Sequence, residues 1–135
     1  MSAIYIHIPF CKTRCTYCDF HSGCDLSLKK QYVETLKKEI VLRKKYIDNQ
    51  PVKTIYFGGG TPSLLSADEL MGIFNVLNQN FDLTSCEEIT LECNPDDLSE
   101  NYVRQLRSLP INRLSIGIQS FNDNELTFIN RRHSA

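Results

Sequence analysis

Short apolar segments alternate with helical patterns along the whole chain, and this alternation constrains the fold more than any other feature. Predicted strands occupy residues 4–8, 52–57, 88–93 and 113–119. Two helices are predicted at residues 27–48 and 99–108. A third is predicted to begin at a capping box at residues 66–69, and a short fourth helix at residue 122. Strands joined by crossover helices predict a parallel sheet. The fold class is therefore α/β with about four β/α units, either an open doubly wound sheet or part of a β/α barrel.

The side chains of the predicted strands favour the barrel. Isoleucines alternate with Tyr5 and His7 in the first strand, and the third and fourth strands carry Glu92 and Gln119 on their polar faces. A doubly wound sheet is covered by helices on both faces, whereas a barrel turns one face toward a cavity. We expect these four side chains to share that cavity near the carboxyl ends of the strands, where β/α folds place their sites. The alternative is a sheet with one wet face.

The charge balance gives no case for a nucleic-acid partner. The formal net charge is −1, and the basic residues at 37–38 and 43–45 are interpreted as a solvated helix face. No apolar run approaches the ~18–20 residues that cross a bilayer, and the first ten residues lack a signal-peptide pattern. We therefore expect no transmembrane segment and a cytoplasmic location. In that reducing compartment the six cysteines are not expected to form disulfides.

Three of these cysteines follow the first predicted strand directly. Cys11, Cys15 and Cys18 have the spacing C-x3-C-x2-C. Structural zinc takes four ligands, and His21 or Cys24 is a possible fourth. A [4Fe–4S] cluster normally takes one thiolate per iron, so three thiolates leave one iron open to a small molecule. A zinc-stapled binding module and a reactive iron–sulfur centre are therefore the two metal hypotheses.

The cysteine motif, in its β/α context, resembles the radical S-adenosylmethionine superfamily. The wider match narrows the resemblance to the HemW/HemN family, which contains haem chaperones and the oxygen-independent coproporphyrinogen III oxidase. It rests on the stretches "IYIHIPFCKTRCTYCDF", "IYFGGGTPSLL", "EITLECNPDDL", "RLSIGIQSFND" and "INRRHSA". The resemblance runs from about residue 3 to 135 and implies the start of a parallel (β/α)6 partial TIM-like barrel.

The resemblance also implies roles for individual residues. Cys11, Cys15 and Cys18 would hold a [4Fe–4S] cluster whose open iron binds S-adenosylmethionine, which the cluster cleaves to a 5′-deoxyadenosyl radical. Tyr17 would lie near the adenine. The remaining family positions expected to contact S-adenosylmethionine are Tyr5, Gly59, Gly60, Thr61, Glu92, Gln119 and Arg131. The glycines are expected there because a side chain would keep the backbone from the ligand.

One position separates the two branches of this family. Phe20 stands where the porphyrinogen-oxidising branch has a fourth cysteine, and the ending "CTYCDF" is similar to the chaperone branch. We therefore expect a portion of a haem chaperone, with coproporphyrinogen III dehydrogenase as the alternative; enzymatic activity is left open. Haem or a porphyrinogen, a haem-acceptor protein and an electron donor such as flavodoxin are the implied partners.

The length of the chain adds an expectation about its domains. Family members run to several hundred residues, so residues 1–135 are expected to be a truncated radical S-adenosylmethionine core domain. The C-terminal half of the barrel and a C-terminal domain would be absent. We expect little or no turnover from this portion alone.

Overall fold

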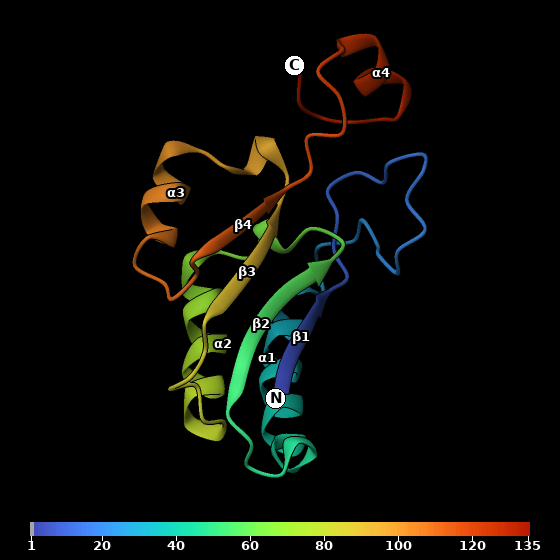
Figure 1. The fold of residues 1–135 in the computed structure, drawn as a ribbon. Helices are drawn as coiled ribbons and strands as arrows, with labels where there is room; N and C mark the ends of the chain where they lie inside the picture. Colours follow the sequence, from blue (N-terminus) through green and yellow to red (C-terminus); the bar gives the residue numbers. More distant parts are fainter. Residues whose placement is uncertain (1) are drawn as a thin grey trace.

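A single parallel sheet organises the computed structural model, which describes residues 2–135 (Figure 1). Its strands are β1 (Ser2–Ile8), β2 (Val52–Gly59), β3 (Glu88–Cys93) and β4 (Arg113–Ile116), and they lie side by side in the order β1-β2-β3-β4. Each strand is thus added next to the preceding one, always on the same side, as in a segment of a β/α barrel. In a doubly wound sheet the direction of strand addition reverses at one point. The predicted α/β class with a parallel sheet is confirmed.

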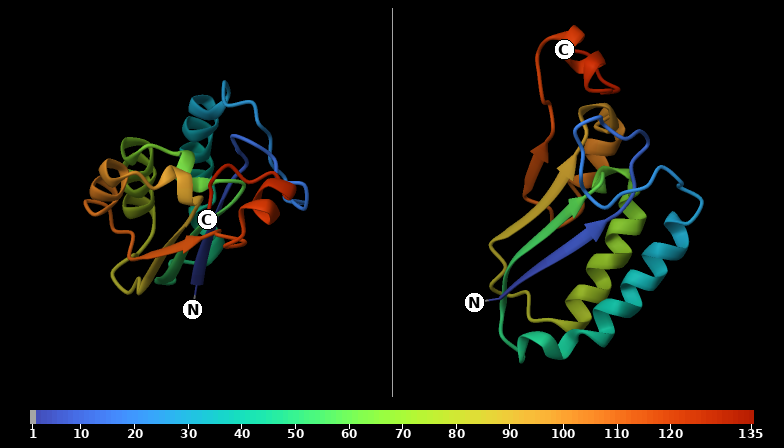
Figure 2. Two further views of the ribbon diagram at one scale, coloured as in Figure 1. Left: turned by 90° about the horizontal axis from the view of Figure 1, so that it is seen from above. Right: turned by 90° about the vertical axis from the view of Figure 1, so that its right-hand side faces the viewer.

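The crossover helices cover one face of the sheet. These are α1 (Lys29–Leu42), α2 (Ala67–Asn80) and α3 (Glu100–Leu106), and Figure 2 shows the other face of the sheet open. Three 3-10 turns, η1 (Lys44–Ile47), η2 (Pro62–Leu64) and η3 (Pro95–Asp97), follow α1, β2 and β3. The short helix α4 (Asp123–Phe128) lies beyond the carboxyl ends of the strands and not against the sheet (Figure 1).

The core lies between the sheet and the helices, as the sequence pattern predicts. The capping box is present, because Ser66 Oγ accepts from the Glu69 amide and the Glu69 carboxylate accepts from the Ser66 amide. It fixes the start of α2, and the predicted apolar side chains of this helix are buried. They are Leu70, Ile73, Phe74 and Leu77. Phe74 meets Phe57 of β2 edge-on at 5.3 Å between ring centroids.

The first helix is shorter than predicted. Its N-cap is Leu28, because both the side chain and the amide of Ser27 bond Asp25 in a local turn. At the other end α1 stops at Leu42, η1 follows, and Asp48 adopts a left-handed φ of 45°. The predicted helix over 27–48 is therefore an α-helix followed by a 3-10 turn.

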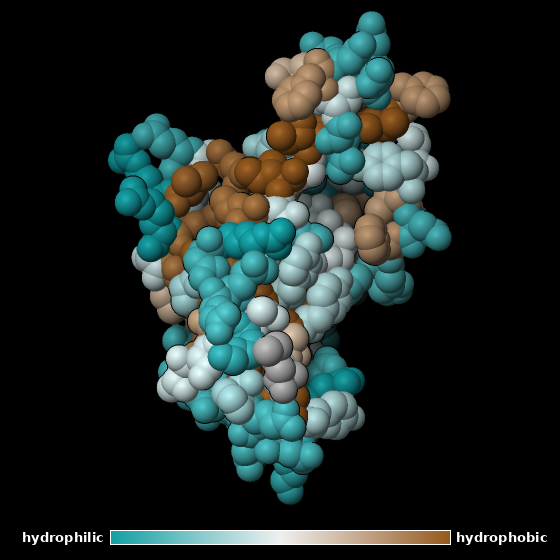
Figure 3. Space-filling model, viewed as in Figure 1, coloured by the Kyte–Doolittle hydropathy of each residue, from teal (hydrophilic) through white to brown (hydrophobic). Residues whose placement is uncertain are grey.

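The fourth strand differs from the prediction in length and burial. It ends at Ile116, and its aliphatic face is exposed: Leu114 by 38%, Ile116 by 44% and Ile118, just beyond it, by 38%. The reason is topological, since β4 is an edge strand and α4 lies beyond the sheet. Figure 3 shows brown, hydrophobic surface over this edge.

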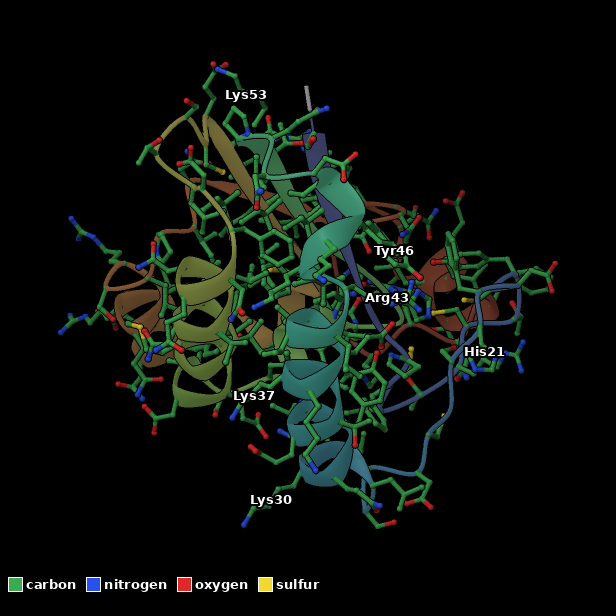
Figure 4. All side chains as sticks on the ribbon, turned by 90° about the horizontal axis from the view of Figure 1, so that it is seen from below. His21, Lys30, Lys37, Arg43, Tyr46 and Lys53 are labelled. Atoms are coloured by element: carbon green, nitrogen blue, oxygen red, sulfur yellow. The ribbon has the colours of Figure 1, made fainter. Side chains whose placement is uncertain are left out.

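The basic residues of α1 and η1 form an exposed face with local ion pairs. Lys37 Nζ lies 2.7 Å from Glu34, and Arg43 Nε lies 2.6 Å from Glu39. Figure 4 shows Lys37 along α1 and Arg43 beside Tyr46, whose ring it covers at 5.3 Å. Such pairs are typical of a solvated helix face. Separately, no helix within residues 2–135 is long and apolar enough to span a membrane.

Candidate metal and cofactor site

A pocket of about 250 Å³ opens at the carboxyl ends of the strands. Its wall combines the cysteine loop (residues 11–20), the glycine turn (residues 58–63), the ends of β3 and β4, and the arginine segment (residues 129–132). This is the edge where a parallel β/α sheet gathers its site residues. Ten of the eleven expected site residues line the pocket: Cys11, Cys15, Tyr17, Cys18, Gly59, Gly60, Thr61, Glu92, Gln119 and Arg131.

Tyr5 is the expected site residue that does not line this pocket. It stacks on Tyr56 of the neighbouring strand, with ring centroids 6.1 Å apart, because the sheet register pairs the two residues. Tyr56 in turn donates a 2.6 Å hydrogen bond to the Glu92 carboxylate. Tyr5 is therefore connected to the pocket residue Glu92 through Tyr56. Partial burial raises the pKa of Tyr5, and the charge of Glu92 adds a smaller effect in the same direction.

The cysteine loop is closed at its base by backbone hydrogen bonds. Cys11 N donates to Gly23 O at 2.9 Å, and Gly23 N donates to Pro9 O at 2.9 Å. Cys11 is buried, while Cys15 and Cys18 are half-buried at the pocket wall. All six cysteines are free thiols, so the loop is held by hydrogen bonds and packing alone.

The geometry of the thiols bears on which metal group they fit. Among residues 2–135, no group of three or more His, Cys, Asp or Glu side chains converges on one metal position. A single zinc ion needs convergence at about 2.3 Å per sulfur. A [4Fe–4S] cluster takes its thiolates on different irons, so their sulfurs stay apart. Three soft thiols on one loop around one pocket match the ligand set of a cluster with one open iron.

The arginine segment lies directly against the cysteine loop, although the two are far apart in sequence (Figures 1 and 2). Thr16 N donates to Ile129 O at 3.3 Å, and Asn130 Nδ2 donates to Arg14 O at 2.8 Å. These bonds hold the middle of the cysteine loop, whereas the backbone bonds of Cys11 and Gly23 hold only its base. The arginine segment thus completes the site wall.

Arg131 is the most extensively bonded cation at the pocket. Its Nη1 lies 3.5 Å from Cys15 Sγ, while Nη2 donates to Asn94 Oδ1 at 2.9 Å and to Gly117 O. Its Nε is buried without a hydrogen-bond partner in the described part of the chain. A buried, unused donor beside three thiols suits an anionic ligand group such as a carboxylate. Sequence reasoning missed Asn94 as a site residue, although it directly follows β3 and continues the alternation of Thr90 and Glu92.

The glycine turn is shaped by the cysteine loop itself. Gly60 N donates to Ile8 O at 2.8 Å, and Thr61 donates twice, from N to Phe10 O at 2.7 Å and from Oγ1 to Cys11 Sγ at 3.4 Å. A Cβ on Gly60 would lie 2.7 Å from Phe10 O. Gly59 has a φ of 108° and packs against the His7 ring. The protein's own packing therefore requires glycine at both positions, in addition to the ligand approach that we predicted.

Gln119 reaches the pocket from a loop and not from a strand. β4 ends at Ile116, and Gly117 N bonds Cys93 O at 3.0 Å as the last contact with β3. Gln119 then adopts a left-handed φ of 69°. This turn places the amide on the pocket wall, although the strand that was predicted to reach residue 119 stops three residues earlier.

Cys93 is the fourth cysteine at the pocket, and it lies at the end of β3, outside the cysteine loop. Burial raises the pKa of the Cys93 thiol to about 12, with Asp97 and Glu92 adding to the effect. Metal ligation requires a thiolate, so Cys93 is a poor fourth ligand. Partial burial, followed by the effect of Cys15, likewise raises the pKa of Tyr17 and keeps its ring neutral.

Comparison with known families identifies this arrangement. The radical SAM superfamily matches residues 5–135. The chain belongs to the radical SAM superfamily. That superfamily implies a [4Fe–4S] cluster and S-adenosylmethionine in general terms, in agreement with three thiols on a loop after β1.

Individual radical SAM relatives cover the same region. The chain is 38% identical over 135 residues to the heme chaperone HemW of Bacillus subtilis, covering 98% of this chain and 36% of that protein. It is 36% identical over 133 residues to HemW of Lactococcus lactis, covering 98% and 34%. The solved structure of coproporphyrinogen III oxidase (HemN) from Escherichia coli matches with a TM-score of 0.88 and 31% identity, covering 98% and 31%. The chain thus spans about a third of the length of these relatives.

Proposed function

We propose that Cys11, Cys15 and Cys18 hold a [4Fe–4S] cluster whose open iron binds S-adenosylmethionine. The observation that carries the proposal is the gathering of these three thiols around one pocket with an unused, buried Arg131 donor. When bound, such a cluster supplies the electron that splits the sulfonium of its ligand. The protein's part is to place the ligand and to limit access of water.

The chemistry of each pocket residue suits a different group of S-adenosylmethionine. Arg131 suits the carboxylate, because a guanidinium donates through several N–H groups. The glycine turn suits the methionyl part, because the missing side chains let a ligand approach the backbone. Glu92 and Gln119 suit ribose hydroxyls. Tyr17, half-exposed at 51%, offers a flat surface for the adenine. Tyr5 would act on this ligand only through Tyr56 and Glu92.

The branch of the family is proposed from a single residue of the pocket. Phe20 lines the pocket at the position where the resemblance to the porphyrinogen-oxidising branch calls for a cysteine. We propose a haem-chaperone role in which haem and a haem-acceptor protein are the partners and an electron donor such as flavodoxin reduces the cluster. The second candidate is coproporphyrinogen III oxidation, supported by the similarity to HemN. Thiolate ligands also favour a reducing, cytoplasmic setting.

Anaerobic reconstitution with iron and sulfide tests the proposal. We expect about four irons per chain and a brown protein, and uptake of zinc without iron would refute it. Incubation with coproporphyrinogen III and a reductant separates the two roles. The chaperone role predicts haem binding without protoporphyrinogen formation, and robust turnover would refute a pure carrier.

A further inference from the structure

Asp97 contacts three separate segments of the pocket wall without lining the pocket. Its Oδ1 accepts from Lys12 Nζ at 2.7 Å, and its Oδ2 accepts from Ser63 Oγ at 2.8 Å. Arg132 Nη2 lies 3.4 Å from the same Oδ1. We propose that Asp97 is a positioning residue that holds the cysteine loop, the glycine turn and the arginine segment at fixed distances around the pocket.

The burial of this carboxylate makes the contacts specific. The Asp97 side chain is 3% exposed, against 21% for Arg132 and 44% for Lys12. A carboxylate removed from water is stable only when it is paired and hydrogen-bonded. Removing its charge therefore takes away the described counter-ion of Lys12 and leaves Arg132 with Asp96 alone, so the cysteine loop loses its ionic link to the other two segments.

Each partner of Asp97 is close in sequence to a residue of the proposed cofactor site. Lys12 follows Cys11, Ser63 comes two residues after Thr61, and Arg132 follows Arg131. The significance of these neighbours rests on the proposed function. That Asp97 joins the three segments, in contrast, rests on its observed contacts and not on the proposed function.

Two residues close to Asp97 in sequence supply a second link to the glycine turn and a matched control for the substitution of Asp97. Asn94 Nδ2 donates to Thr61 Oγ1 at 3.4 Å, and Ser63 Oγ accepts from Asn94 N at 3.2 Å, so η3 begins and ends on the glycine turn. Asp96, adjacent to Asp97, bonds Arg132 Nη1 at 2.6 Å and has no described contact with Lys12 or Ser63. Asp96→Asn therefore makes the same chemical change one residue away while sparing two of the three segments.

The test measures how fast iodoacetamide alkylates each cysteine of the metal-free protein, by peptide mass spectrometry. Buried Cys11 reacts only when the cysteine loop opens, whereas Cys93 within β3 reports global unfolding. We expect Asp97→Asn and Lys12→Met to speed the alkylation of Cys11 roughly 5- to 30-fold over Asp96→Asn. The rate at Cys93 should stay unchanged in Lys12→Met, whose side chain is exposed.

Two results would overturn the inference: a Cys11 rate in Lys12→Met equal to that in Asp96→Asn, or a parallel rise at Cys11 and Cys93. Lys12→Met decides the matter even where Asp97→Asn fails to fold. A parallel measurement on reconstituted protein follows bleaching of the cluster in air, which should be faster in Lys12→Met than in Asp96→Asn. If the unsubstituted chain takes up no iron, the proposed function fails, while the alkylation rates still decide the role of Asp97.

Discussion

The guanidinium of Arg131 lies 3.5 Å from the sulfur of Cys15, although 116 residues separate them in sequence. This contact joins the arginine segment to the centre of the cysteine loop. The same guanidinium donates to Asn94 Oδ1 at 2.9 Å, so one side chain connects the loop to the residue that follows β3. The site is therefore assembled only when β4 and α4 have brought the arginine segment back to the cysteine loop.

The role of Arg131 as a structural anchor predicts a measurable loss of stability. Arg131→Gln removes the charge and most of the bonds to Asn94, Gly117 and Cys15, so we expect the free energy of unfolding to fall by about 1.5–3 kcal/mol. Urea denaturation of the metal-free protein measures this change. Arg104→Gln, which breaks an exposed ion pair with Glu100, should cost only about 0.3–0.5 kcal/mol. Equal effects of the two substitutions would contradict the anchoring role.

The assignment of the cluster ligands predicts a sharp difference between cysteines. Cys15→Ala removes one of three thiols at the pocket, so the reconstituted protein should retain no complete cluster. Cys24→Ala changes an exposed cysteine outside the pocket and should leave iron and sulfide at about four each per chain. Iron and sulfide analysis with visible absorption checks both. A full cluster in Cys15→Ala would exclude this residue as a ligand.

The close packing of the glycine turn predicts a strong effect of one methyl group. A Cβ at Gly60 would lie 2.7 Å from Phe10 O and 3.0 Å from Cys11 Sγ. We expect Gly60→Ala to lower the free energy of unfolding by about 1–3 kcal/mol and to reduce cluster uptake. Gly23→Ala is the control, because a Cβ there meets nothing within 4 Å. Chemical denaturation of both variants settles the comparison, and an unchanged Gly60→Ala protein would show that the turn can shift.

The raised pKa of Cys93 predicts a pH dependence at the alkaline end. Between its ordinary value of 9.0 and about 12, the folded protein keeps the proton of this thiol while the unfolded chain loses it. The folded state therefore binds more protons, and stability falls as pH rises through this range. The free energy of unfolding of Cys93→Ala should fall less steeply from pH 9 upward than that of the unsubstituted protein. Parallel curves for the two proteins would contradict the shifted pKa.

Much of the fold could be predicted because local signals set it. The capping box at Ser66 and Glu69 fixed one helix start, and the alternation in 88–93 matched the bounds of β3. The errors arose where another local contact competed or where burial depended on topology. Asp25 bonds the side chain and amide of Ser27, the residue that was expected to cap α1. The aliphatic face of β4 is exposed because no described helix packs over it.

The site was predictable to the extent that strand ends identify it. Parity placed Glu92 at the pocket, and the cysteine spacing placed three thiols on one loop. The residues that hold the wall together were missed, since their partners are distant in sequence. Asp97 meets Lys12 across 85 residues, and Asn94 meets Arg131 across 37. Only the parallel order of the strands brings such pairs together.

The central claim is that three thiols hold a cluster with one iron open to S-adenosylmethionine. Electron paramagnetic resonance of the reconstituted, reduced protein tests it most directly, with spectra recorded before and after addition of S-adenosylmethionine. Binding at the open iron changes its ligand field, so we predict that the spectrum of the reduced cluster shifts on addition. An unchanged spectrum from protein that holds about four irons per chain would contradict the claim.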